Sequence, residues 1–146
     1  AFDSFTGPIW ASHCNCRTLV AHQRQLDDEH IKILIEKQGV IGVVFDAWMM
    51  VPQWIKGTST PQQSNLKTEA IIEHIDHICQ LAGTSDHVGI GSDLDGGYGT
   101  EQCPTDIDSI EKLQIIAPLL AKRGYSPLDI EKIMSRNWIN FLERAL

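Results

Sequence analysis

The chain has 146 residues, 42% hydrophobic content and a formal net charge of −7 at pH 7. These values suit one globular domain, or part of one, with a real apolar core. The basic residues are spread along the sequence, which argues against nucleic acid or an anionic membrane as a partner and favours a small polar or charged substrate. The longest apolar runs are far shorter than a membrane span, so a soluble, cytoplasmic protein is expected.

The first predicted element is a strand over residues 8–12, which ends at His13. The polar segment that follows has no clear period up to Gln25 and is predicted to be a long loop of functional size. Asp27 then has the position of a helix N-cap, and apolar residues at helical spacing follow it until Gly39. The sequence therefore predicts a strand, a loop and a helix in that order.

A continuous apolar run over residues 40–45 predicts a second strand with both faces buried, as in a parallel sheet covered by helices. Residues 46–65 are predicted to form a loop. Ser64 or Asn65 is expected to cap the next helix, and Gly83 is expected to end it. The apolar stripe of this helix consists of Ile71, Ile75, Ile78 and Ala82.

A third strand is predicted over residues 88–90, and it leads into a glycine-rich turn that carries Asp93 and Asp95. Barrel enzymes present an acid in this way, at the C-terminal end of a strand. Asp93 follows the strand directly and is therefore the candidate catalytic residue. The alternative is an ordinary Asp-Gly turn with a solvated Asp95, and the turn by itself favours that alternative.

Helical segments complete the chain. Thr105 or Asp106 is expected to cap a helix over residues 107–114, and Pro118 is expected to break it and start another. A last amphipathic helix is predicted over residues 137–146. The order of strands and helices predicts an α/β fold with a parallel sheet and right-handed crossovers.

His13 and Asp93 occupy equivalent positions, each at the end of a predicted parallel strand, so both side chains are expected at the same rim of the sheet. An imidazole and a carboxylate on one rim suit a divalent metal, or a metal-bound water with its proton acceptor. A structural histidine is the alternative for His13. A metal site made of His13, Cys14 and Cys16 is disfavoured because adjacent positions of an extended segment point to opposite sides.

Three other titratable residues invite a functional interpretation. Arg24 lies in the loop after the first strand, where its guanidinium could clamp a substrate carboxylate, but spacing alone favours an exposed ion pair with Asp27 or Asp28. His74 and His77 lie one helical turn apart, as in some metal motifs. Helical-wheel positions put His74 at the edge of the apolar stripe and His77 on the polar side, so a structural role is predicted for both.

Six segments of the chain form one further pattern: Ala11-Ser12-His13, Arg24-Gln25-Leu26, Gly39-Val40-Ile41-Gly42-Val43, His74-Ile75-Asp76-His77-Ile78, Gly89-Ile90-Gly91-Ser92-Asp93-Leu94-Asp95-Gly96 and Arg123-Gly124-Tyr125-Ser126. Together they resemble the membrane dipeptidase (renal dipeptidase) family of zinc peptidases, and they follow the family's order across nearly the whole chain. The resemblance implies a metal-dependent (β/α)8 TIM-like barrel that holds two zinc ions and hydrolyses dipeptides through a metal-bridging hydroxide.

The resemblance also implies roles for single residues. His13 matches a histidine ligand of the second zinc ion, and Arg24 matches the residue that binds the terminal carboxylate of the substrate. Asp93 matches the acid that contacts the substrate amine and handles the proton. The paired histidines His74 and His77 match a stretch without a ligand role.

The family's remaining metal ligands belong to the first half of its barrel, and no residue of this chain matches them. Residues 1–146 are therefore expected to be the C-terminal part of one barrel domain, its last three strand-helix units, and to be inactive without the N-terminal half. The expected partners are a dipeptide substrate and that missing half, and a homodimer is left open. A related amidohydrolase, an N-acyl amino acid deacylase or a non-catalytic binding subunit are the alternatives.

Overall fold

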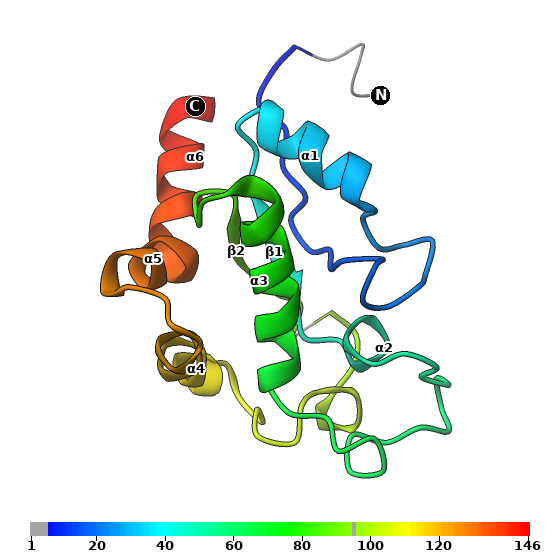
Figure 1. Ribbon diagram of the computed structural model, residues 1–146. Helices are drawn as coiled ribbons and strands as arrows, with labels where there is room; N and C mark the ends of the chain where they lie inside the picture. Colours follow the sequence, from blue (N-terminus) through cyan, green and yellow to red (C-terminus); the bar gives the residue numbers. More distant parts are fainter. Residues whose placement is uncertain (1–5, 95) are drawn as a thin grey trace.

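The computed structural model describes residues 6–94 and 96–146, so Asp95 lies outside the described residues. Two short parallel strands, β1 and β2, lie at the centre, with helix α3 in front of them in Figure 1 and helices α4, α5 and α6 to the left. The elements in chain order are α1 (Asp28–Glu36), β1 (Ile41–Val44), α2 (Ala47–Met50), α3 (Glu69–Ala82), β2 (Val88–Ser92), η1 (Thr100–Gln102), η2 (Ile110–Ile115), α4 (Ile116–Arg123), α5 (Pro127–Glu131), η3 (Lys132–Arg136) and α6 (Asn137–Ala145).

Both central strands fall where the apolar runs of the sequence predict them. Residue Ile41 of β1 pairs with Val88 of β2, and the register shifts by one residue between Val43 and Val44. All four residues of β1 are buried, which confirms the prediction of a strand covered on both faces. The mixed α/β class with a parallel sheet is therefore confirmed.

The predicted first strand over residues 8–12 is reduced to a single parallel bridge between Ala11 and Ile41. Ala11 donates its N–H to the carbonyl of Val40 at 3.0 Å and accepts the N–H of Gly42 at 2.8 Å. Pro8 has no N–H to extend this ladder. The segment still runs parallel to β1, so three chain segments point in the same direction.

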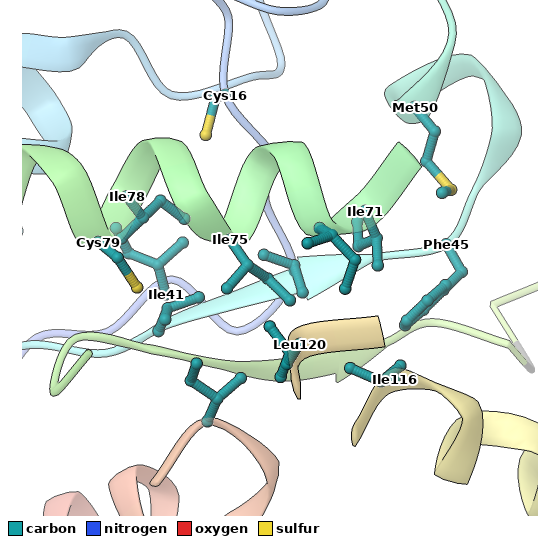
Figure 2. Packing of buried hydrophobic residues seen from close by; sticks show 14 of the residues in the cluster. Cys16, Ile41, Phe45, Met50, Ile71, Ile75, Ile78, Cys79, Ile116 and Leu120 are labelled. Atoms are coloured by element: carbon teal, nitrogen blue, oxygen red, sulfur yellow. The ribbon is translucent and has the colours of Figure 1, made fainter. Parts of the chain in front are cut away.

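The core joins the strands to helices from both halves of the chain. Figure 2 shows Ile71, Ile75 and Ile78 of α3 pointing toward the strands, as the predicted apolar stripe requires. Ile116 and Leu120 of α4 also belong to this cluster and are fully buried. Burying aliphatic side chains of this size contributes roughly 1.5–3 kcal/mol each, so α3 is fixed firmly against the sheet.

The helix ends follow local signals in some places and tertiary contacts in others. Asp27 caps α1 as predicted, because its side chain accepts the N–H of His30. This helix ends at Glu36 and not at Gly39, since Gln38 already takes a left-handed φ of 56°. Gly83 ends α3 as predicted, with a φ of 67°.

The cap predicted for α3 at Ser64 or Asn65 is wrong. Asn65 has a left-handed φ of 47°, and Thr68 occupies the N-cap position. The N–H and hydroxyl of Thr68 both donate to Asp106 Oδ1 at 2.9 Å. Asp106, which lies in a loop far along the chain, thus accepts the hydrogen bonds at the start of α3. Local spacing in the sequence does not reveal this contact.

Two further predictions about loops and helices need correction. Residues 46–65 contain the short helix α2, which follows Asp46. A helix over residues 107–114 is absent from this described stretch, because Asp106 is engaged with Thr68 and the 3-10 turn η2 begins only after Ser109. Pro118 lies in the first turn of α4, where a missing N–H is tolerated.

Helix α6 confirms the predicted amphipathic C-terminal helix. Two of its side chains reach the outer edge of β2: Asn137 Nδ2 donates to the carbonyl of Val88 at 2.8 Å, and Trp138 Nε1 donates to that of Ile90 at 3.1 Å. A Cβ at Gly89 would lie 2.5 Å from Trp138 Nε1, so only glycine admits the indole. No helix in the described part of the chain has both the length and the apolar character needed to cross a bilayer.

Candidate active site at the carboxyl edge of the sheet

The carboxyl ends of the three parallel segments meet at one edge of the sheet, which we call the carboxyl edge. Cys14 donates its N–H to the carbonyl of Gly42 at 2.8 Å, and Phe45 donates to that of Ser92 at 3.1 Å. A Cβ at Gly42 or at Gly91 would lie 2.2 or 2.3 Å from the carbonyl oxygen of Ser12. These glycines therefore let the backbone just before His13 lie across both strands, close to the start of the Asp93 turn.

His13 leaves this edge with one ring nitrogen engaged. Its Nδ1 lies 2.7 Å from the hydroxyl of Ser12, and no bond of the described structure engages its Nε2. A histidine that ligates a metal commonly has its second nitrogen hydrogen-bonded in this way, which fixes the ring. Within residues 6–94 and 96–146, however, no three His, Cys, Asp or Glu side chains are grouped as a metal site would require.

Asp93 follows β2 in a left-handed conformation, with a φ of 63° after a φ of 32° at Ser92. Non-glycine residues rarely adopt such values, and they concentrate at functional sites. The half-buried carboxylate lies over Gly96, where a Cβ would come within 2.2 Å of Oδ1. It makes no hydrogen bond or ion pair to any described residue.

Arg24 is exposed on the loop after His13. Its Nη1 donates to Cys14 Sγ at 3.3 Å, and none of the described carboxylates pairs with it. The ion pair favoured by spacing is wrong, because Asp27 pairs with Arg17 at 3.0 Å and Asp28 contacts His77 at 2.8 Å. The guanidinium is thus left with the capacity to bind an external carboxylate.

Two buried amides, Asn15 and Gln25, fix the loop that carries these groups. Asn15 Nδ2 donates to the carbonyl of Val44 at 2.9 Å, and its Oδ1 accepts the N–H of Val44, also at 2.9 Å. Gln25 accepts the backbone N–H of Asn15 at 3.1 Å and donates to the carbonyl of Met49 at 2.8 Å. The loop is therefore anchored to β1 and α2 on either side of Arg24.

Asp46 is a second carboxylate at the carboxyl edge, and sequence reasoning missed it. It follows β1 and accepts Trp48 Nε1 at 2.6 Å and Gln102 Nε2 at 2.8 Å. Burial raises the pKa of this carboxyl, against the hydrogen bonds that lower it. Asp46 thereby ties the loop after β2 to the end of β1, and its position directly after a buried strand was the available signal.

The histidines of α3 are structural, as the helical wheel predicts. His74 is buried and accepts the N–H of Cys16 on Nδ1 at 3.1 Å, and burial followed by the nearby charge of His77 lowers its pKa to about 4. His77, one turn along the helix, contacts Asp28 of α1 at 2.8 Å. The Cys16 thiol faces the carbonyl of His74 at 3.5 Å, and burial raises its pKa to about 12, so it is engaged in the fold.

The fold matches that of a known metallopeptidase. The crystal structure of the dipeptidase AC, a metallopeptidase of family M19, superposes with a TM-score of 0.79 at 25% sequence identity. The match covers 95% of this chain and 38% of that one. The mixed α/β fold of this chain is therefore shared with part of that metallopeptidase.

Sequence comparisons identify the family. An uncharacterised Klebsiella pneumoniae protein from the pqqA 5′ region is 29% identical over 96% of this chain and 48% of its own length. The dipeptidase tcpJ of Claviceps purpurea is 28% identical over 99% of this chain and 31% of its own length. The chain therefore spans about half or less of these relatives. The family described as membrane dipeptidase (peptidase family M19) matches residues 2–145, and the chain belongs to it, as its sequence motifs indicate.

Proposed function

We propose that residues 1–146 are the C-terminal part of the (β/α)8 barrel of a zinc-dependent dipeptidase. The parallel arrangement of the Ala11 segment, β1 and β2 supports this assignment, since consecutive parallel strands with helical crossovers are the repeating unit of such a barrel. The chain spans only 31–48% of the relatives and of the solved structure, which supports the proposal that it is one part of a larger barrel. The remaining strands belong to polypeptide outside this range.

One observation carries the proposal: within the described residues, the side chains of Arg24 and Asp93 have no partner of opposite charge. Elsewhere, Arg17 pairs with Asp27, and Arg123 pairs with two carboxylates of α3. Charges that remain unpaired at the carboxyl edge of a parallel sheet are where a barrel enzyme binds its substrate. A zwitterionic dipeptide carries both of the complementary charges.

The roles of these two residues follow from their charges. Arg24 binds the terminal carboxylate of the dipeptide through the fork of its guanidinium. Asp93 binds the free amine at the other end and carries the proton to the leaving nitrogen as the peptide bond breaks. An N-acyl amino acid has no amine for Asp93, so the unpaired carboxylate favours a dipeptidase over a deacylase.

His13 is the metal ligand of this chain. Its free Nε2 and the hydroxyl of Ser12 on Nδ1 fit a ring held for coordination. When bound, zinc supplies Lewis acidity for the peptide carbonyl and lowers the pKa of water. Because a catalytic zinc normally has three protein ligands, the other ligands come from the rest of the barrel, and residues 1–146 alone are inactive.

All four cysteines are free thiols, which supports a reducing compartment such as the cytoplasm.

The experiment compares two arginines in the full-length, zinc-loaded protein that carries these residues. Arg24→Met should raise the KM for L-alanyl-L-alanine by about 10- to 100-fold, because a charged hydrogen-bonded pair is lost. Arg144→Met is the matched control, since Arg144 also has no carboxylate partner in the described chain but contacts the carbonyl of Gln38 instead. Unchanged kinetics in Arg24→Met, or dipeptide hydrolysis by residues 1–146 alone, would contradict the proposal.

A further inference from the structure

A pocket of about 500 Å³ opens beside the Arg24 loop, between that loop and the segment after β1. Its walls are aromatic and aliphatic, with His22 and Val20 on one side and Trp48, Val51 and Trp54 on the other. The ring of His22 meets Trp48 edge to face, with centroids 4.7 Å apart. The pocket is thus bounded by rigid rings and can hold a side chain.

The pocket shares a wall with the proposed carboxylate site. Arg24 donates its backbone N–H to His22 Nδ1 at 3.1 Å, so the residue that lines the pocket is hydrogen-bonded to the residue that binds the substrate terminus. Gln25 holds the same loop to Met49 of α2 at 2.8 Å. The backbone of Arg24 therefore adjoins the wall of the pocket.

The pocket wall also contains an unsatisfied hydrogen-bond donor, and its rim carries a cation. Trp54 Nε1 is buried and, within the described structure, has no hydrogen-bond acceptor. A buried donor left in this state costs roughly 1–3 kcal/mol unless a ligand satisfies it. Lys56 on the rim is exposed and forms no ion pair with the described residues, although its charge acts on Asp46. By contrast, Trp48 Nε1 donates to Asp46 at 2.6 Å, so the neighbouring indole is satisfied.

We propose that this pocket receives the side chain of the C-terminal residue of the substrate and selects an acidic one, aspartate or glutamate. The inference rests on the proposed function, because binding of the terminal carboxylate by Arg24 would place the C-terminal residue of the substrate at the mouth of this pocket. The aromatic walls contact the methylene groups of that side chain. Its carboxylate accepts the N–H of Trp54 and pairs with Lys56.

The test compares L-alanyl-L-aspartate with L-alanyl-L-asparagine, which has nearly the same shape but no side-chain charge, in the full-length, zinc-loaded protein. We expect kcat/KM to be about tenfold higher for the aspartate dipeptide. Lys56→Met should bring this ratio close to one, whereas Trp54→Phe should lower kcat/KM for both dipeptides, because the asparagine amide oxygen also accepts the indole N–H. Lys67→Met, at an exposed lysine outside the pocket, should leave the ratio unchanged. A ratio near one in the parent, or an unchanged ratio in Lys56→Met, would overturn the inference.

A binding measurement separates this inference from the proposed function. Two of the four tryptophans line the pocket, so tryptophan fluorescence should report occupancy. Hydrolysis of both dipeptides without preference would remove the acidic selectivity and leave the dipeptidase function standing. Lys56-dependent binding of the aspartate dipeptide without hydrolysis would retain the pocket and remove the function. Absence of both binding and hydrolysis would overturn both.

Discussion

The α3 helix and the carboxyl edge of the sheet use the same residue types in opposite ways. On α3, His74 accepts a backbone N–H, and Asp76 accepts both Arg123 at 2.9 Å and Tyr125 at 3.0 Å. At the carboxyl edge, Arg24 and Asp93 find no opposite charge among the described residues. Buried polar groups that hold a fold together are normally satisfied within it, and two unpaired opposite charges at the carboxyl edge support the proposal of a ligand site there.

The difference also appears in the electrostatics of the two regions. The pKa of the Asp76 carboxyl is lowered: burial would raise it, but hydrogen bonds from Arg123 and Tyr125 and the charge of Arg123 outweigh burial. The carboxylate therefore stabilises the fold in its charged form. Asp93 has no comparable bond, and its left-handed backbone adds strain. Stability is thus concentrated on α3, and the proposed chemistry lies at the edge.

The largest expected effect comes from exchanging one carboxylate in each region for an amide. In the full-length, zinc-loaded protein, Asp93→Asn should lower kcat by about 10²- to 10⁴-fold, because proton transfer is lost. Its Tm should change by less than about 2 °C, since no described bond is removed. Kinetics on L-alanyl-L-alanine and thermal unfolding measure both quantities.

Asp76→Asn is the matched control for this exchange. It should lower the Tm and leave kcat unchanged, because Asp76 joins α3 to the end of α4. Unchanged turnover in Asp93→Asn would remove Asp93 from the mechanism and erase the contrast between the two regions.

The second effect is a pH dependence of stability that originates in α3. The pKa of His74 falls from 6.5 to about 4 on folding, so the unfolded chain binds the proton more readily. The stability from this group is complete above about pH 6.5 and is lost as the pH falls toward 4, by about 3 kcal/mol in total. His74→Asn keeps an acceptor for the N–H of Cys16 and should flatten this decline in urea unfolding experiments at each pH.

His77→Asn, one turn along the same helix, is the control for the pH experiment. His77 contacts Asp28 in a partly buried pair, so this variant should retain most of the decline between pH 6.5 and 4, reduced only by the loss of the His77 charge beside His74. If His74→Asn declines as steeply as the parent, the buried imidazole is not its source.

The smallest effect is expected from the exposed ion pairs that join α3 to α4. Arg123 binds both oxygens of Glu73, at 2.8 and 3.0 Å, but these groups are well exposed and screened by solvent. Arg123→Met should lower the Tm by less than about 3 °C at low salt, with little difference from the parent in 1 M salt. A large, salt-independent loss in differential scanning calorimetry would show that its side-chain packing matters more than its charge.

Local signals in the sequence were enough to predict much of the fold. The uniformly apolar run of β1, the cap at Asp27 and the stop at Gly83 depend on neighbours in the chain, and all three are confirmed. The start of α3 could not be predicted, because Asp106, 38 residues along the chain, serves Thr68. Because Asp106 accepts from Thr68, it does not cap the helix that was predicted to follow it, and the 3-10 helix η2 begins only at Ile110.

The sequence was enough to predict the charged residues of the candidate site, but not the hydrogen bonds that hold their loop in place. The positions of His13 and Asp93 at strand ends follow from the parallel order of the elements. The network of Asn15 and Gln25 joins residues up to 34 positions apart, so no spacing rule could reveal it. Arg24 is left without an ion pair because Arg17 pairs with Asp27 instead, and sequence spacing does not show which of the two arginines forms that pair.

Helix α6 has a further consequence for the behaviour of the chain in solution. Side chains of Asn137 and Trp138 occupy carbonyls on the outer edge of β2, which would otherwise be available to any extended segment. Exposed strand edges promote self-association and aggregation. Helix α6 therefore covers this edge of β2. In the proposed closed barrel, an adjoining strand would pair with the same edge.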